Sequence, residues 1–103
     1  MSDIFKAAFI FVAPNAAPEM HNSWVKTPQV QVKIIAVSNY QQAGDLLDVL
    51  YDEGIRFVEL CAGFGHQGVA HMVAMAKGRM EVGVVRFDTH PGLGNVSGDS
   101  LFM

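Results

Sequence analysis

This chain of 103 residues has one cysteine, Cys61. A single cysteine cannot form a disulfide within the chain, so nothing in the sequence requires an oxidising compartment. No apolar run approaches the roughly 20 residues that a membrane-spanning helix needs. The apolar start is interrupted by Asp3 and Lys6 and lacks a following small-residue cleavage site, which favours a strand over a signal peptide. We therefore expect a soluble cytoplasmic protein with no membrane partner.

Charged side chains are also scarce, at 17% of the residues, where about a quarter is usual. The 7 basic residues are scattered among 10 acidic ones, and the formal net charge is −3. No basic stripe follows the chain, which argues against a nucleic-acid partner. A protein with half of its residues hydrophobic and so few charges is expected to bury some apolar surface between subunits, most simply in a homodimer.

The order of apolar patterns predicts the fold class. β-Branched and aromatic runs predict strands at 4–13, 30–38, 55–62 and 81–88, and helical periodicity predicts helices at 39–54 and 68–78. From residue 30 onward the alternation of strand and helix favours parallel strands joined by right-handed crossovers. We expect one small α/β domain spanning 1–103, with a mainly parallel four-stranded sheet, two principal helices and a flavodoxin-like or half-Rossmann layout.

Local signals place the ends and inner faces of the two helices. Asn39 is a candidate N-cap, and Gly54 and Gly78 are candidate stops. Spacing predicts two inner stripes, Ala43, Leu46, Leu47 and Leu50 on the first helix and Val69, Met72, Val73 and Ala76 on the second. His71 falls outside the second stripe and is expected to be solvated.

Two segments have no clear period. Residues 14–29 contain three prolines and favour a loop, with a short helix at about 18–24 as the alternative. Residues 89–103 are either a flexible tail or a strap that docks Leu101, Phe102 and Met103 on another surface.

Same-sense crossovers place both helices on one face of the sheet and leave the other face open. Lys33, Glu59 and Arg86 are charged residues within predicted strands. Glu59 and Arg86 can pair across neighbouring strands, as a structural ion pair at a subunit interface. We expect the homodimer to form through the open face or a strand edge.

The stretch "ELCAGFGHQG" at 59–68 contains a glycine pattern, Gly63-x-Gly65-x-x-Gly68, between a strand and a helix. Asp88 ends the next strand, where a dinucleotide fingerprint expects an acid. Two features weigh against a full dinucleotide site. The chain is too short for the usual two mononucleotide-binding halves, and the glycine pattern follows the third predicted strand instead of the first. Glycines permit close backbone approach, and the free N–H groups of a first helical turn favour an anion. The alternatives are therefore a phosphate or carboxylate pocket, a dinucleotide site and a turn with no ligand.

Several reactive side chains border this turn. Because the carboxyl ends of parallel strands share one rim, Cys61, His66, Asp88 and His90 can converge there. The predicted ligand-binding set is Gly63, Phe64, Gly65, His66, Gly68, Asp88 and His90. The candidate catalytic groups are Cys61 or Glu59 with His66 or His90 as acid–base partner. No pair has a recognised metal-ligand spacing, so no metal is predicted, and the residues specify no cofactor.

The phrases "KAAFIFVAP", "TPQVQV", "ELCAGFGHQG" and "VGVVRFD" give the whole chain its resemblance to a family of small microbial proteins, about a hundred residues long and of unknown function. The resemblance implies a small α/β domain and no activity. From the residues, three functions remain open: binding of a small anionic metabolite at the glycine turn, catalysis of an isomerase, lyase or hydrolase type, and a non-catalytic oligomeric interaction protein.

Overall fold

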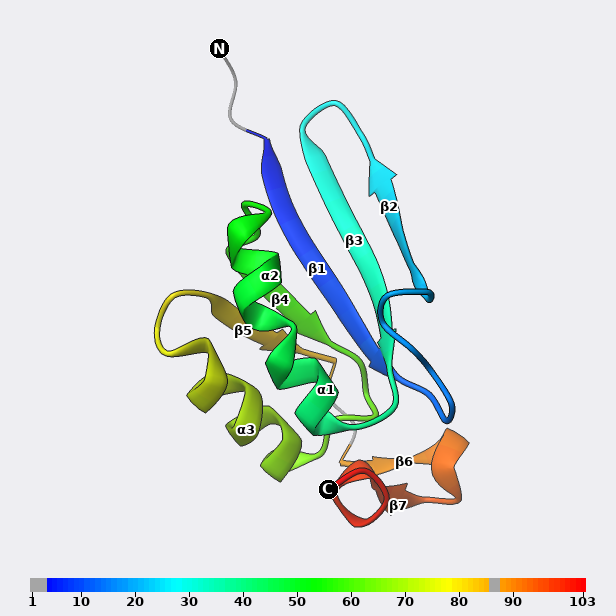
Figure 1. Cartoon of the computed structure of the whole chain (residues 1–103). Helices are drawn as coiled ribbons and strands as arrows, with labels where there is room; N and C mark the ends of the chain where they lie inside the picture. Colours follow the sequence, from blue (N-terminus) through cyan, green and yellow to red (C-terminus); the bar gives the residue numbers. More distant parts are fainter. Residues whose placement is uncertain (1–3, 86–87) are drawn as a thin grey trace.

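The protein is described by a computed structural model over residues 4–85 and 88–103. Its centre is a five-stranded sheet in the order β2-β3-β1-β4-β5 (Figure 1). The middle strand β1 (Phe5–Val12) runs parallel to both β3 (Val30–Val37) and β4 (Phe57–Leu60), and β5 (Glu81–Val84) is parallel to β4. This arrangement confirms the predicted α/β class with a mainly parallel sheet.

The core lies between the sheet and three helices, which all cover the same face (Figure 1). Alternate strand residues, among them Ile10, Ile35 and Leu60, point to this face and are fully buried together with Leu47 and Met72 of the helices. Burial of these side chains removes their apolar surface from water, which is the main stabilising term of such a fold. The prediction that the helices share one face is confirmed.

The first predicted helix is broken in two. Asn39 caps it as expected, because its side chain accepts the N–H of Gln42 at 2.9 Å. Helix α1 (Tyr40–Asp45) ends at Leu46, and α2 (Leu47–Asp52) follows at once. Gly44 and Asp45, both weak helix formers, precede the break. Gly44 also lets helix α3 (His66–Ala76) approach closely, since a Cβ there would lie 2.9 Å from His71 Nε2.

The prediction for residues 14–29 is wrong in its second half. Strand β2 (Asn22–Lys26) lies there and pairs antiparallel with β3, so the sheet has one strand more than expected. Its pattern is hard to recognise because an edge strand buries little, and only Trp24 of the five residues is half-buried. Trp24 packs against the core and lies opposite Lys33.

The predicted inner stripe of the second helix is displaced. Helix α3 starts at His66, and its buried residues are Gly68, Met72 and Ala76. Val73 is exposed, whereas His71 is half-buried, so both expectations are wrong. Helix α3 packs against α1 as well as against the sheet. The contact with α1 extends the buried face of α3 to include His71.

The face of the sheet opposite the helices carries no covering element among the described residues (Figure 1). Its side chains alternate with those of the core, and Phe5 and Phe57 stack on it with ring centroids 4.4 Å apart. They keep 44% and 38% of their surface exposed, which is high for phenylalanine in a strand. We call this surface the open face.

The end of the chain is folded beneath the carboxyl ends of the strands (Figure 1). A small hairpin pairs β6 (Thr89–His90) with β7 (Val96–Ser97), and two short 3-10 helices, η1 (Pro91–Leu93) and η2 (Gly98–Ser100), complete it. Phe102 packs against the core, while Leu101 and Met103 are exposed. We call residues 96–103 the C-terminal strap.

Two of the three charged strand residues, Lys33 and Glu59, lie within the described part of the chain. Lys33 Nζ lies 3.0 Å from Glu53 Oε1 at the end of α2, which joins the sheet to the helix layer. Glu59 is exposed on the open face. Its predicted partner, Arg86, lies outside the described residues. No helix of the described part of the chain is long and apolar enough to span a membrane.

Candidate functional site

The glycine turn forms where predicted, between the carboxyl end of β4 and the start of α3. The backbone of Cys61 is tied to β1 by a hydrogen bond to Ile10 O (3.0 Å), and the N–H of Phe64 donates back to Cys61 O (3.1 Å). Gly65 is the N-cap of α3 and has no side chain to accept the first free N–H groups of the helix. These donors must therefore be satisfied by a group from elsewhere.

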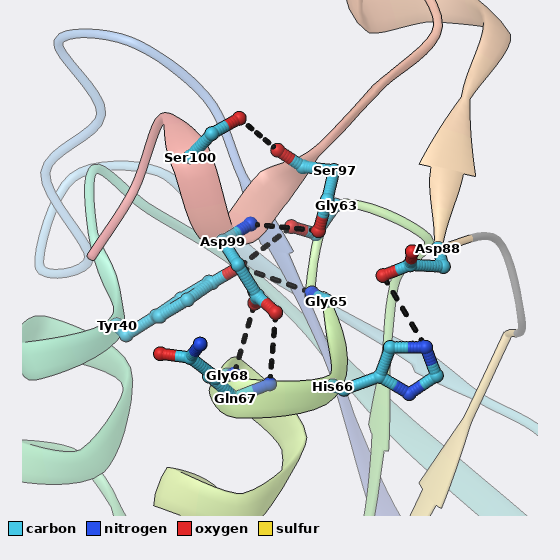
Figure 2. Close-up of polar contacts among 10 residues, drawn as sticks. All are labelled: Tyr40, Gly63, Gly65, His66, Gln67, Gly68, Asp88, Ser97, Asp99 and Ser100. Atoms are coloured by element: carbon cyan, nitrogen blue, oxygen red, sulfur yellow. Dashed lines mark hydrogen bonds and ion pairs between the residues drawn. The ribbon is translucent and has the colours of Figure 1, made fainter.

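The C-terminal strap supplies that group. Asp99 Oδ2 accepts the N–H of Gln67 at 3.0 Å, and Oδ1 accepts the N–H of Gly68 at 3.2 Å (Figure 2). The N–H of Asp99 in turn donates to Ser97 Oγ at 3.1 Å. A carboxylate at this position is favoured by both the free N–H groups and the helix dipole. A carboxylate of the chain itself thus occupies the position at which a small anionic ligand was predicted.

Tyr40 connects the strap and the turn from the side of α1. Its hydroxyl oxygen accepts the N–H of Gly65 at 3.0 Å and lies 3.1 Å from Gly63 O and 3.3 Å from Asp99 Oδ1 (Figure 2). Its single proton can serve only one of these two acceptors at a time. The ring stacks on Phe64 with centroids 5.0 Å apart, and Phe102 packs beside it at 6.3 Å.

The close approach of these groups explains the glycine pattern. A Cβ on Gly65 would collide with the Asp99 carboxylate and Ser97 Oγ, and a Cβ on Gly68 would lie 2.5 Å from the Tyr40 ring. In the strap, a Cβ on Gly98 would collide with the carbonyl oxygen of Gly63. The glycines therefore make room for other parts of the same chain.

Two of the predicted rim residues meet. His66 Nε2 lies 3.4 Å from Asp88 Oδ1 (Figure 2), with the His66 side chain largely exposed and Asp88 half-buried. The side chain of His90 lies outside the described part of the structure. Asp88 and His66 thus converge as the shared rim of parallel strands predicts.

The other candidates point elsewhere. The thiol of Cys61 accepts the N–H of Gly63 at 3.2 Å and packs beside the core. Glu59 belongs to the face opposite to the one that α3 covers, and Phe64 is buried, with 1% of its surface exposed. Among the described residues there is no group of three or more potential metal ligands.

Comparison with known protein families gives a match over most of the chain. The sequence profile of a family of unknown function, DUF6506, covers residues 5–100. The chain belongs to DUF6506. No curated protein and no solved structure matches it. The family match covers the sheet, the glycine turn and the strap through Ser100, and it assigns no activity to them.

A pocket of about 310 Å³ lies beside the strap in this DUF6506 chain, between Tyr40, His71 and Phe102. The buried Nε2 of His71 has no hydrogen-bond partner among the residues that the structure describes. It abuts Gly44 in the contact between α1 and α3. An unpaired buried nitrogen costs free energy, which the surrounding helix packing must offset.

Three residues that organise the turn of this DUF6506 chain were not among the predicted site residues: Tyr40, Ser97 and Asp99. A usable signal was present in the sequence. With glycine at the N-cap, α3 lacks its own acceptor, and the strap "VSGDS" (96–100) carries a carboxylate within a serine-rich turn. What the sequence does not reveal is that residues 31 positions apart meet at this turn.

Burial raises the pKa of Tyr40 from 10.0 to about 12, and the nearby Asp99 carboxylate adds to the shift. Because the folded state disfavours the ionised phenol, the stabilising contribution of neutral Tyr40 is fully present below pH 10.0. It is lost as the pH rises through about 12, the pKa of Tyr40 in the folded protein. We expect urea midpoints of the natural protein to fall across this interval more steeply than those of Tyr40→Phe. Parallel pH profiles of the two proteins would show that Tyr40 does not titrate there.

Proposed function

We propose that this protein is a non-catalytic interaction module that acts through the open face of its sheet. The observation that carries this proposal is the exposed Phe5–Phe57 stack on a sheet face that no described element covers. Soluble proteins rarely expose a contiguous apolar surface that serves no contact. The low charge content of the chain points the same way, because few charges are left to solvate a second exposed layer.

The occupation of the glycine turn supports this choice over a ligand-binding role. The N–H groups of Gln67 and Gly68 already donate to Asp99. A metabolite would have to displace this carboxylate together with the packing of Phe102 on the core. The cost of that displacement lowers the affinity of any competing anion.

A photo-crosslinking amino acid at position 57, introduced in the cells that make the protein, tests the proposal. We expect crosslinked products with the probe at position 57, on the open face. The matched control places the probe at position 73 on the outer side of α3, where Val73 is 53% exposed. Equal yields at the two positions would contradict an interaction through the open face.

Binding of a small anionic metabolite at residues 63–68 is a second candidate. It is favoured by one observation, that two backbone N–H groups there hold a carboxylate with distances of 3.0 and 3.2 Å. The experiment replaces Asp99 with alanine, adds phosphate or a small carboxylic acid, and measures whether the added anion raises the urea midpoint. A catalytic role for Cys61 or Glu59 has no comparable support, since Cys61 is engaged by Gly63 and Glu59 lies on the opposite face from α3.

A further inference from the structure

The open face has an apolar part and an acidic edge. Two adjacent apolar rows lie at the same levels on this face: Phe5, Ala7, Phe9 and Phe11 of β1 beside Val30, Val32, Ile34 and Ala36 of β3. Val25 on β2 continues the level of Val32. Among the described strand residues, the carboxylates of this face are Glu59 and Glu81, and they lie on β4 and β5, at the other side of the sheet.

We infer that the partner on this face is a second copy of the chain, related by a two-fold axis that runs parallel to the strands and midway between β1 and β3. This inference rests on the proposed function of the open face. Rotation about this axis does not shift residues along the strand direction, so each residue faces partner residues at its own level. It also lays β1 over the partner's β3 and β4 over the partner's β2.

The register of the sheet makes this superposition apolar on both sides. Phe5 lies at the level of Val30, so it stacks on the partner's Val30, and Phe9 stacks on the partner's Ile34. Phe57 is level with Ala7, Val32 and Val25, and it stacks on the partner's Val25. Sheets packed face to face keep their strands within about 30° of each other, which this axis allows.

The charges select the direction of the axis. With the axis along the strands, β5 extends past the edge of the partner's β2, so Glu81 stays in solvent beside that edge and is not laid on the partner's apolar rows. Glu59 lies over the partner's Ser23, which can donate a hydrogen bond. An axis perpendicular to the strands would instead place the acidic edges of both copies on each other, and like charges in apposition oppose association.

The area approaches what a small dimer interface needs. With strands about 4.8 Å apart and a rise of about 3.3 Å per residue, the overlapping strands β1, β3, β2 and β4, of 8, 8, 5 and 4 residues, cover roughly 400 Å² per copy. Two copies then bury about 800 Å² in projection, against the roughly 1,000 Å² expected of a biological interface. Protruding aromatic rings add to this area, and aromatic residues are the usual energetic centres of interfaces.

Sedimentation equilibrium of the purified full chain tests the inference. We expect twice the chain mass of 11.2 kDa at micromolar concentration. Ile34→Glu places a carboxylate against the partner's Phe9 and should weaken association at least a hundredfold while the circular dichroism spectrum stays that of the folded protein. The matched control, Val73→Glu on α3, should remain dimeric, since Val73 lies outside the open face.

Crosslinking tests the axis. In a Cys61→Ser background, a Phe57→Cys chain mixed with a Val25→Cys chain should form a heterodimer with a short bismaleimide, and either chain alone should not. A monomer at all accessible concentrations, or dissociation by Val73→Glu but not by Ile34→Glu, would overturn the inference. If the purified protein is a monomer but position 57 still crosslinks to a different protein in cells, the interaction function stands and the second copy fails. If the protein is a monomer and position 57 gives no crosslinked product, both the inferred dimer and the proposed interaction function fail.

Discussion

Replacement of Gly98 with alanine should lower the free energy of unfolding by about 2–4 kcal/mol, because the added methyl group collides with a backbone atom that cannot move aside. The Cβ would overlap the carbonyl oxygen of Gly63 and lie 2.9 Å from the Tyr40 hydroxyl. Since Gly63 is held within the turn, the strap has to lift. The lift removes the Asp99 cap from α3 and the Phe102 packing together.

Urea denaturation of this variant beside Gly83→Ala measures the effect. Gly83 lies in β5, and a Cβ there meets nothing within 4 Å, so alanine should change stability by no more than about 0.5 kcal/mol. Faster backbone amide exchange at Gln67 and Gly68 should accompany the loss in Gly98→Ala, because these two N–H groups lose their acceptor, Asp99. An unfolding midpoint equal to that of Gly83→Ala would show that the strap is not held against the turn.

Replacement of Asp99 with alanine should cost about 1–3 kcal/mol and should make the protein sensitive to added anions. The cost arises because the buried N–H of Gly68 and the N–H of Gln67 lose a charged acceptor. With the carboxylate gone, phosphate or a small carboxylic acid can reach the same two donors. Its addition should then raise the urea midpoint of Asp99→Ala more than that of the natural protein.

The matched control is Asp52→Ala, which removes an exposed carboxylate of the same charge from the end of α2. An anion that stabilises Asp99→Ala but neither the control nor the natural protein would support the second candidate function, with the strap as an internal competitor. Equal anion effects on all three proteins would reduce that candidate to a general salt effect, and the glycine turn would serve only to dock the strap.

The regular elements of the fold were predictable because their signals are local. The apolar runs of β1, β3, β4 and β5 and the capped helix at Asn39 depend on residues that are neighbours in the chain. The uncovered sheet face followed from the handedness of the crossovers. Strand β2 was missed because an edge strand with one half-buried side chain has no strong alternation.

The helix faces show a second limit. Spacing on α3 predicted an inner Val73 and an outer His71, and both assignments were wrong. Periodicity gives the angle between side chains but not the direction of the neighbouring element. Here α3 packs on α1 as well as on the sheet, and the glycine at position 44 allows the close contact that buries His71 Nε2.

The sequence by itself determined the α/β class, the one-sided helix layer and a strand-to-helix turn with free N–H groups, and it left open whether the turn holds a ligand. These properties depend on composition, periodicity and the backbone chemistry of a helix start, all of which are readable over short distances along the chain. Only the tertiary structure decided which anion occupies the turn. Asp99 reaches Gly68 because the strap folds back under the sheet, where Gly65 and Gly98 leave room for it and the Tyr40 hydroxyl lies within hydrogen-bond distance. Such a contact between distant segments depends on how closely two backbones can approach, which no local pattern encodes.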